Sequence, residues 1–155
     1  MKNQERGRHV LNLSNEIVKY LKLYSKRIKI VGSIRRKVEN PGDIDIVLIP
    51  KDKEKLEEFL MKKGRFIQGG EKESTFRIKG VKVELYYTVP EEWGAALLAY
   101  SSEAGAGIGL RIFAKERGFK LSQHGLFKNG KRIAGRTEKD IYNALGKKWK
   151  SPEKR

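Results

Sequence analysis

The stretch VGSIRRKVENPGDIDI (residues 31–46) combines a glycine-serine turn, a pair of arginines and two aspartates that alternate with isoleucines. Alternation of apolar and polar residues predicts a β-strand with one buried face. Side chains two residues apart on a strand point the same way, so Asp43 and Asp45 share one face while Ile44 and Ile46 occupy the other. We infer that two carboxylates held side by side serve chemistry rather than packing.

A third carboxylate stands in a later segment of the same kind. The segments 74–79 and 81–88 alternate on either side of Gly80 and predict two antiparallel strands. If the second of them neighbours the strand of Asp45 in one sheet, Glu84 joins the two aspartates. Three carboxylates this close raise each other's pKa values unless a cation lies among them, and Mg²⁺ is the natural occupant of such an oxygen site.

The residues upstream of the aspartates suit the phosphates of a nucleotide. Gly32 and Gly42 permit a close backbone approach, Ser33 offers a hydroxyl and an N–H, and Arg35 or Arg36 can bind phosphate oxygens. Two metal ions can activate an attacking hydroxyl and stabilise the leaving oxygen in phosphoryl transfer. Alone, each motif has a plainer reading as a turn or a solvated strand residue, but the combination favours a magnesium-dependent phosphoryl transferase.

The charge balance indicates a polyanionic partner. The 155 residues include 35 Lys and Arg against 19 Asp and Glu, a net charge of +16. Nucleic acid is the first candidate because phosphate contacts release counterions. An anionic membrane surface is the second, although no long basic amphipathic helix is evident. A need for solubility in a hot environment explains many charges but not a one-sided excess.

Several classes of protein are excluded. The chain has no cysteine, which removes disulfides and thiolate metal sites. No apolar run reaches the roughly 18 residues of a membrane-spanning helix, and residues 1–10 lack the apolar core of a signal peptide. We expect a soluble, cytoplasmic monomer with no membrane partner.

The fold class we expect is α+β, with a mixed first part to about residue 90 and a small second part. Residues 1–10 are predicted to be loose. Helices are predicted over 10–24, 51–63, 90–100, 102–116 and 137–146, and strands over 27–31, 43–49, 74–79, 81–88, 119–122 and 126–128, followed by a turn at Asn129-Gly130. Ser102 and Thr137 are the predicted N-caps of their helices. The glycines of 103–109 fall within a helix, which favours close packing or flexibility over a phosphate loop.

At these residues the sequence resembles the nucleotidyltransferase superfamily and, more narrowly, the family X DNA polymerases. GSIRR (32–36) and GDID (42–45) match the family's palm motif, and VKVEL (81–85) lies where the family has its third metal ligand. That ligand is usually Asp, so Glu84 is a departure. The thumb is matched by WGAAL (93–97), LR (110–111), KLSQHGLF (120–127) and TEKDIYNALG (137–146).

The resemblance implies a catalytic palm at 1–90, a mixed β-sheet with flanking helices, and a nucleotide- and DNA-contacting thumb at 91–155. Asp43, Asp45 and Glu84 would be the catalytic residues and would hold two Mg²⁺ ions, or Mn²⁺ in their place, with Glu84 also helping to deprotonate the primer 3′-hydroxyl. The nucleotide would be bound by Gly32, Ser33, Arg36, Gly42 and Tyr100. DNA would be contacted by Lys82, Arg111, Gln123 and His124.

Two departures from the family concern the sugar and base of the nucleotide. Where the family has Tyr-Phe-Thr-Gly under the sugar, this chain has Ala99-Tyr100-Ser101-Ser102. The family's asparagine at the minor-groove edge of the incoming base becomes Gly107. We expect weak discrimination between ribose and deoxyribose, unless Tyr100 takes over the missing role.

A further departure is the lack of room for the family's lyase and fingers regions, since the first palm strand is predicted near Arg27. The phosphate contacts that those regions make would come from surface cations, with Lys22, Lys26, Arg27 and 147–155 as candidates. The leading hypothesis is a metal-dependent DNA polymerase that extends primers in short gaps during repair, acting on gapped or primed duplex DNA with nucleoside triphosphates. The alternatives are a minimal nucleotidyltransferase with an RNA, protein or small-molecule acceptor, and an inactive nucleic-acid-binding module. Retention of the three carboxylates argues against the inactive module.

Overall fold

The chain forms two compact units, Met1–Tyr87 and Thr88–Arg155, in a computed structural model that describes residues 2–155. Each unit has its own hydrophobic core. None of the helices in the described residues is long and apolar enough to cross a membrane.

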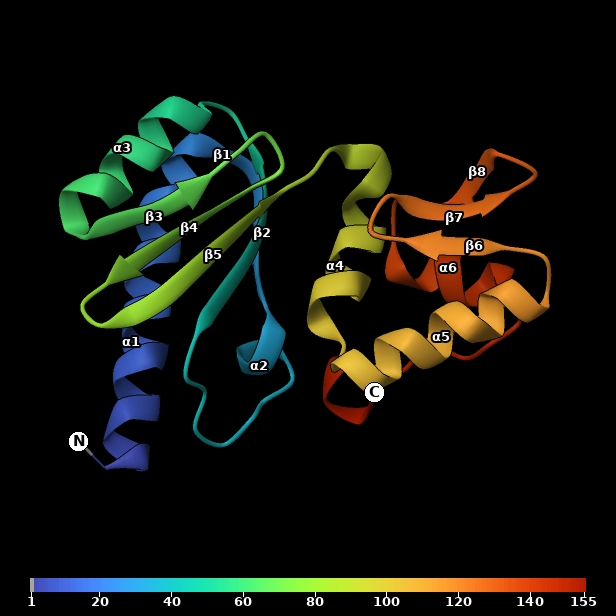
Figure 1. Cartoon of the computed structure of the whole chain (residues 1–155), viewed down its shortest axis with the longest axis horizontal. Coiled ribbons are helices and arrows are strands. Elements are labelled where there is room, and N and C mark those ends of the chain that lie inside the picture. The colour runs from blue at the N-terminus through green and yellow to red at the C-terminus, as the bar shows by residue number, and fades with distance from the viewer. Residues whose placement is uncertain (1) are drawn as a thin grey trace. The chain divides into compact units, whose positions relative to one another are not determined.

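The first unit is built on a five-stranded mixed sheet with the order β1-β2-β5-β4-β3 (Figure 1). β2 pairs with β5 in parallel, and the other neighbours are antiparallel. The elements of this unit are α1 (Asn3–Leu21), η1 (Lys22–Tyr24), β1 (Ser25–Val31), α2 (Gly32–Arg35), β2 (Ile44–Pro50), α3 (Lys53–Lys63), β3 (Arg65–Gly69), β4 (Glu73–Ile78) and β5 (Val81–Tyr87). The predicted mixed sheet is therefore confirmed.

Helices α1 and α3 cover one face of this sheet (Figure 1). The Asp52 side chain caps α3 by accepting a hydrogen bond from the Lys55 N–H at 3.1 Å, and the helix ends at Gly64. The core holds the apolar stripes of both helices and alternate residues of the strands: Val10, Leu13, Ile17, Leu21, Leu56, Leu60, Ile44, Ile46, Leu48, Phe76, Ile78, Val81, Val83 and Leu85. Burial of these residues on one face leaves the other face of the sheet for polar side chains.

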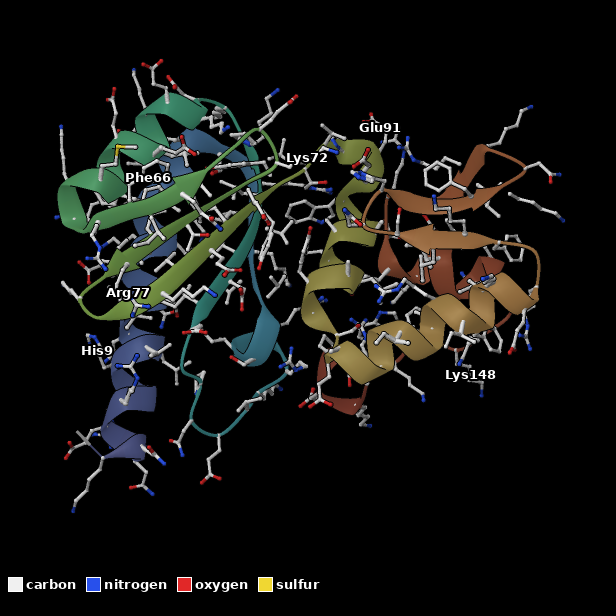
Figure 2. All side chains as sticks on the ribbon, viewed as in Figure 1. His9, Phe66, Lys72, Arg77, Glu91 and Lys148 are labelled. Carbon is white, nitrogen blue, oxygen red and sulfur yellow. The ribbon has the colours of Figure 1, made fainter. Side chains whose placement is uncertain are left out.

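Helix α1 begins at Asn3, so the prediction of a loose N-terminal segment was wrong. The first turns of the helix are held by the turn between β4 and β5. The Arg6 guanidinium donates to the Gly80 carbonyl at 3.2 Å, and His9 Nε2 lies 3.0 Å from the Lys79 carbonyl. Arg77 donates to the same Gly80 carbonyl at 3.4 Å, and His9 and Arg77 both lie near this turn (Figure 2). These tertiary contacts were not visible in the local sequence pattern.

The second unit packs helices against one face of a three-stranded antiparallel sheet with the order β6-β7-β8. Its core holds Ala95, Leu98, Ala114, Leu126, Ile141, Tyr142 and Leu145. The elements are η2 (Pro90–Glu92), α4 (Trp93–Ser101), α5 (Ala104–Glu116), β6 (Lys120–Ser122), β7 (Gly125–Lys128), β8 (Lys131–Ala134), α6 (Glu138–Ala144) and η3 (Pro152–Lys154). Strand β8, like β3 in the first unit, was not predicted.

One of the two predicted helix caps is confirmed. The Thr137 hydroxyl accepts a hydrogen bond from the Asp140 N–H at 3.0 Å at the start of α6. Ser102 instead belongs to the end of α4, where its hydroxyl donates to the Leu98 carbonyl at 2.9 Å, and α5 begins after Glu103. The N-cap prediction for Ser102 was therefore wrong.

The glycine-rich segment lies within α5, as predicted, but it is not closely packed. A Cβ added at Gly105 or Gly109 would meet nothing within 4 Å, and one at Gly107 would meet only Ser102 Cβ, at 3.9 Å. The close-packing explanation is therefore wrong. Glycine in a helix interior is less favourable than alanine by about 1 kcal/mol, which leaves the first half of α5 intrinsically weak.

Gly94 is the glycine on which the packing of the second unit depends. Its N–H donates to the Arg136 carbonyl at 3.1 Å, and the N–H of Ala95 donates to the Gly135 carbonyl at 3.0 Å. A Cβ on Gly94 would lie 2.2 Å from the Thr137 carbonyl carbon. The start of α4 therefore fits against residues 135–137 only without a side chain.

Gly94→Ala should lower the free energy of unfolding of the second unit by about 1–3 kcal/mol or more, because backbone must move to admit the methyl group. Both tryptophans, Trp93 and Trp149, lie in this unit, so urea unfolding followed by their fluorescence is the measurement. Gly105→Ala is the matched control and should be neutral or stabilising by up to about 1 kcal/mol. Equal losses in both variants would contradict the packing argument.

Candidate active site

Two of the three predicted carboxylates, Asp45 and Glu84, lie on the sheet face opposite α1 and α3, and Asp43 lies just before β2. Asp45 of β2 is the register partner of Glu84 on β5, so the expected neighbourhood of these two residues is confirmed. Asp43 precedes Asp45 by two residues and is exposed, whereas Asp45 and Glu84 are half-buried. Parallel pairing of two strands thus brings together acids that are 39 positions apart in the sequence.

Two neighbouring side chains on β5 bind the oxygens of Glu84. Lys82 Nζ lies 2.6 Å from Glu84 Oε1. The Tyr86 hydroxyl donates to Glu84 Oε2 and also lies 3.3 Å from Asp45 Oδ1. Lys82 was expected to contact DNA, and that role stays a prediction beside the ion pair that it forms here. A cation and a hydroxyl thus partly offset the repulsion within the acidic cluster.

The pKa values of the two half-buried acids are shifted in opposite directions. Burial, followed by the charges of Glu84 and Asp43, raises the pKa of Asp45 to about 6, against the opposing hydrogen bond from Tyr86. Partial burial acts to raise the pKa of Glu84 as well, but the hydrogen bonds from Lys82 and Tyr86 hold it below its ordinary value. Burial and the bond to Glu84 raise the pKa of the Tyr86 hydroxyl, which therefore stays a donor. Asp45 is the acid that most needs a compensating cation.

The donor set fits a hard divalent cation by its chemistry. Asp45 and Glu84, with Asp43 nearby, offer carboxylate oxygens of the kind that Mg²⁺ prefers, and a cation would relieve their repulsion. Within residues 2–155, no three Asp, Glu or His side chains are gathered closely enough to share an ion. Both oxygens of Glu84 are engaged by Lys82 and Tyr86, so binding of an ion there requires Glu84 to exchange these partners.

The glycine-serine turn begins beside Asp45. Val31, the last residue of β1, pairs with Asp45, and α2 follows directly. Gly32 has φ +65°, and a Cβ on it would lie 2.3 Å from Asp45 Oδ2, so only glycine fits. Ser33 and Arg36, the expected phosphate ligands, follow on from this residue and are half-buried. Gly42 is exposed, with open space around its Cα.

The remaining predicted residues lie in the second unit. Ala99 and Gly107, the two departures from the family, line one pocket together with Arg111. Tyr100 is half-buried on α4, next to Ala99.

Gln123 and His124 form the turn between β6 and β7. His124 Nδ1 lies 2.6 Å from Glu92 Oε1, and Arg132 donates to the other oxygen of Glu92 at 3.1 Å. A carboxylate from the start of the unit thus orients the imidazole of this turn.

Sequence reasoning assigned no role in these sites to two residues. Strand alternation places Tyr86 on the face of Glu84, two positions earlier on β5, but its hydrogen bond to that carboxylate was not predicted. No role in these sites was predicted for Glu92. Its pairing with His124 joins positions 32 apart, and no local pattern predicts that contact.

Asp45→Asn should stabilise the metal-free protein at neutral pH. The carboxyl has a pKa of about 6 when folded and 3.8 ordinarily, so the folded state binds more protons between these values and loses stability as pH rises through them. The difference corresponds to about 3 kcal/mol above pH 6. Urea unfolding followed by circular dichroism in a chelator should show a gain approaching that size at pH 8 and almost none below pH 4.

Glu58→Gln, which removes an exposed acid from α3, is the control for this measurement and should change stability equally at both pH values. An Asp45→Asn variant whose stability relative to wild type is the same at pH 8 and pH 4 would refute the assigned burial cost.

Comparison with known proteins identifies the family. Residues 96–155 match the family model of the DNA polymerase beta thumb. Over 99% of its length the chain is 30% identical to Repair DNA polymerase X of African swine fever virus (isolate Tick/South Africa/Pretoriuskop Pr4/1996), of which it covers 93%. It is 37% identical over 65 residues to DNA polymerase IV of Saccharomyces cerevisiae, covering 42% of this chain and 11% of that protein. The chain belongs to the family X DNA polymerases.

Proposed function

We propose that this family X polymerase uses divalent metal ions to add nucleotides to a primer 3′-hydroxyl in short gaps of duplex DNA. The observation that carries the proposal is the direct pairing of Asp45 with Glu84 across β2 and β5, with Asp43 near enough for its charge to act on Asp45. The name of the viral relative, a repair polymerase, supports a role in repair.

The chain's own residues divide the work of the reaction. Asp43, Asp45 and Glu84 would hold two Mg²⁺ ions, or Mn²⁺ in their place. When bound, these ions supply Lewis acidity at the attacking and leaving oxygens of the phosphoryl transfer. The primer 3′-oxygen forms a bond to the α-phosphorus as the bond to pyrophosphate breaks, and Glu84 helps to accept the proton of the hydroxyl.

Binding of the substrates falls to residues outside the carboxylate cluster. Ser33, Arg36 and Gly42 would bind the β- and γ-phosphates, with Gly32 admitting the backbone close to Asp45. Arg111, Gln123 and His124 would contact the template strand. The net charge of +16 supports DNA as the polyanion.

Extension of a labelled primer across a one-nucleotide gap tests the mechanism. Asp45→Asn should reduce the rate by about 1,000-fold or more, because a ligand that stabilises developing charge is lost. The variant should also be at least as stable as wild type, so its inactivity would not reflect unfolding. Glu58→Gln is the control and should extend the primer at the wild-type rate. Near-normal extension by Asp45→Asn would end the proposal.

Selection of the nucleotide sugar should be weak in this chain. Ala99 and Gly107 line the same pocket as Arg111, and the two residues contribute only one methyl group to it. A pocket that lacks a steric block rejects an added hydroxyl by only about 100-fold. We propose that ribonucleotides are incorporated with little penalty, because no aromatic side chain stands at position 99.

Single-nucleotide incorporation opposite one template base checks this proposal. The wild-type ratio of kcat/KM for dNTP over rNTP should be below about 100, and Ala99→Phe should raise it by narrowing the pocket. Tyr100→Ala measures whatever selectivity the neighbouring tyrosine supplies. A strong dNTP preference in wild type that survives Tyr100→Ala would contradict the idea.

A further inference from the structure

The three-stranded sheet of the second unit presents two different faces. Leu121 and Leu126 pair across β6 and β7 and point into the core, where Ala134 of β8 also packs. The opposite face carries Lys120, Phe127 and Arg132, which are successive register partners across the three strands. This outer face therefore shows an aromatic ring between two cations.

A depression of about 530 Å³ lies at this outer face. Phe119 and Phe127 line it together with Lys115, Lys120, Ser122 and His124, and no Asp or Glu is among the described residues that line it. The segment 115–132 holds six Lys or Arg against one acid. Pockets of this size accommodate small organic ligands, and the surrounding charge favours an anionic one.

Each of the two rings that line the depression has a cation beside it. The Arg132 guanidinium carbon lies 5.4 Å from the centroid of the Phe127 ring, and Lys128 Nζ lies 5.5 Å from that of Phe119. Arg132 is held in place by its bonds to Glu92 Oε2 at 3.1 Å and to the His124 carbonyl at 3.0 Å. Arg132 is thereby fixed beside Phe127, which leaves Lys115 and Lys120 to bind phosphates.

We propose that this face, hereafter the Phe127 platform, stacks an unpaired base of single-stranded DNA. Aromatic side chains beside cations bind single strands because every base has a π-face and every linkage a phosphate. A base within a duplex cannot offer its face to a ring in a depression, so the platform selects unpaired template rather than the duplex. The inference rests on the proposed function, which makes template DNA the substrate.

Fluorescence anisotropy with a labelled 12-nucleotide oligothymidylate and with a blunt duplex of the same length, at one salt concentration, tests the platform in the full chain. Phe127→Leu should weaken binding of the single strand by about 5- to 50-fold, through the loss of one stacked base. Binding of the duplex should change less than about twofold. Phe66→Leu, which alters a 42% exposed phenylalanine on β3 of the first unit, is the matched control and should leave both affinities unchanged.

A second variant keeps the test decisive if Phe127→Leu folds poorly. In Phe127→Trp the new indole should be quenched on addition of the oligothymidylate, beyond the signal from Trp93 and Trp149 in wild type. Three results would each overturn the inference: wild-type affinity of a folded Phe127→Leu for the single strand, equal losses for single strand and duplex, or no added quenching in Phe127→Trp.

Failure of the platform and failure of the proposed function are separable. A wild-type protein that fills gaps, with single-strand binding insensitive to Phe127, would remove the platform alone. Phe127-dependent binding in a wild-type protein that extends no primer would remove the polymerase mechanism and keep the platform.

Discussion

The parallel pairing of β2 with β5 is the constraint on which the candidate active site depends. It fixes Asp45 beside Glu84 and forces two acids into a half-buried position where like charges repel. Strand β5 itself partly offsets this repulsion, because Lys82 and Tyr86 lie on either side of Glu84 in sequence and bind its two oxygens. A half-buried acid pair of this kind is less stable than a neutral one, and such perturbed groups are typical of functional sites.

Strand periodicity was enough to predict the centre of the first unit. Alternation placed Asp43, Asp45 and Glu84 on polar faces, and the β2–β5 pairing confirmed the neighbourhood of the last two. What local pattern could not supply were the contacts between distant segments. The first turns of α1 are held by the carbonyls of the β4–β5 turn. Strand β3 is an edge strand in which all five residues are exposed, so it has no buried face to produce a period. Ser102 suits either end of a helix. Only the hydrogen bond that its hydroxyl donates to the Leu98 carbonyl shows that it belongs to the end of α4.

In the second unit, buried and half-buried acids hold basic side chains in defined positions. Glu92 joins His124 to Arg132, so an acid from the start of the unit orders a turn and a strand that follow 30 or more residues later. On the buried side, the Arg155 guanidinium pairs with Glu138 at 2.8 Å and both side chains are almost fully enclosed. Replacing only one residue of such a pair is strongly destabilising, because the charge of the other residue stays buried without a partner.

The three glycines of α5 make the first half of this helix less stable than its second half. Its second half is anchored by Ala114 in the core, whereas a Cβ added at Gly105 or Gly109 would meet nothing within 4 Å. Local opening of the first turns therefore needs far less free energy than global unfolding. Amide hydrogens there would exchange with solvent while those of β7 stay protected, so the helix that carries Arg111 is rigid at one end and free to rearrange at the other.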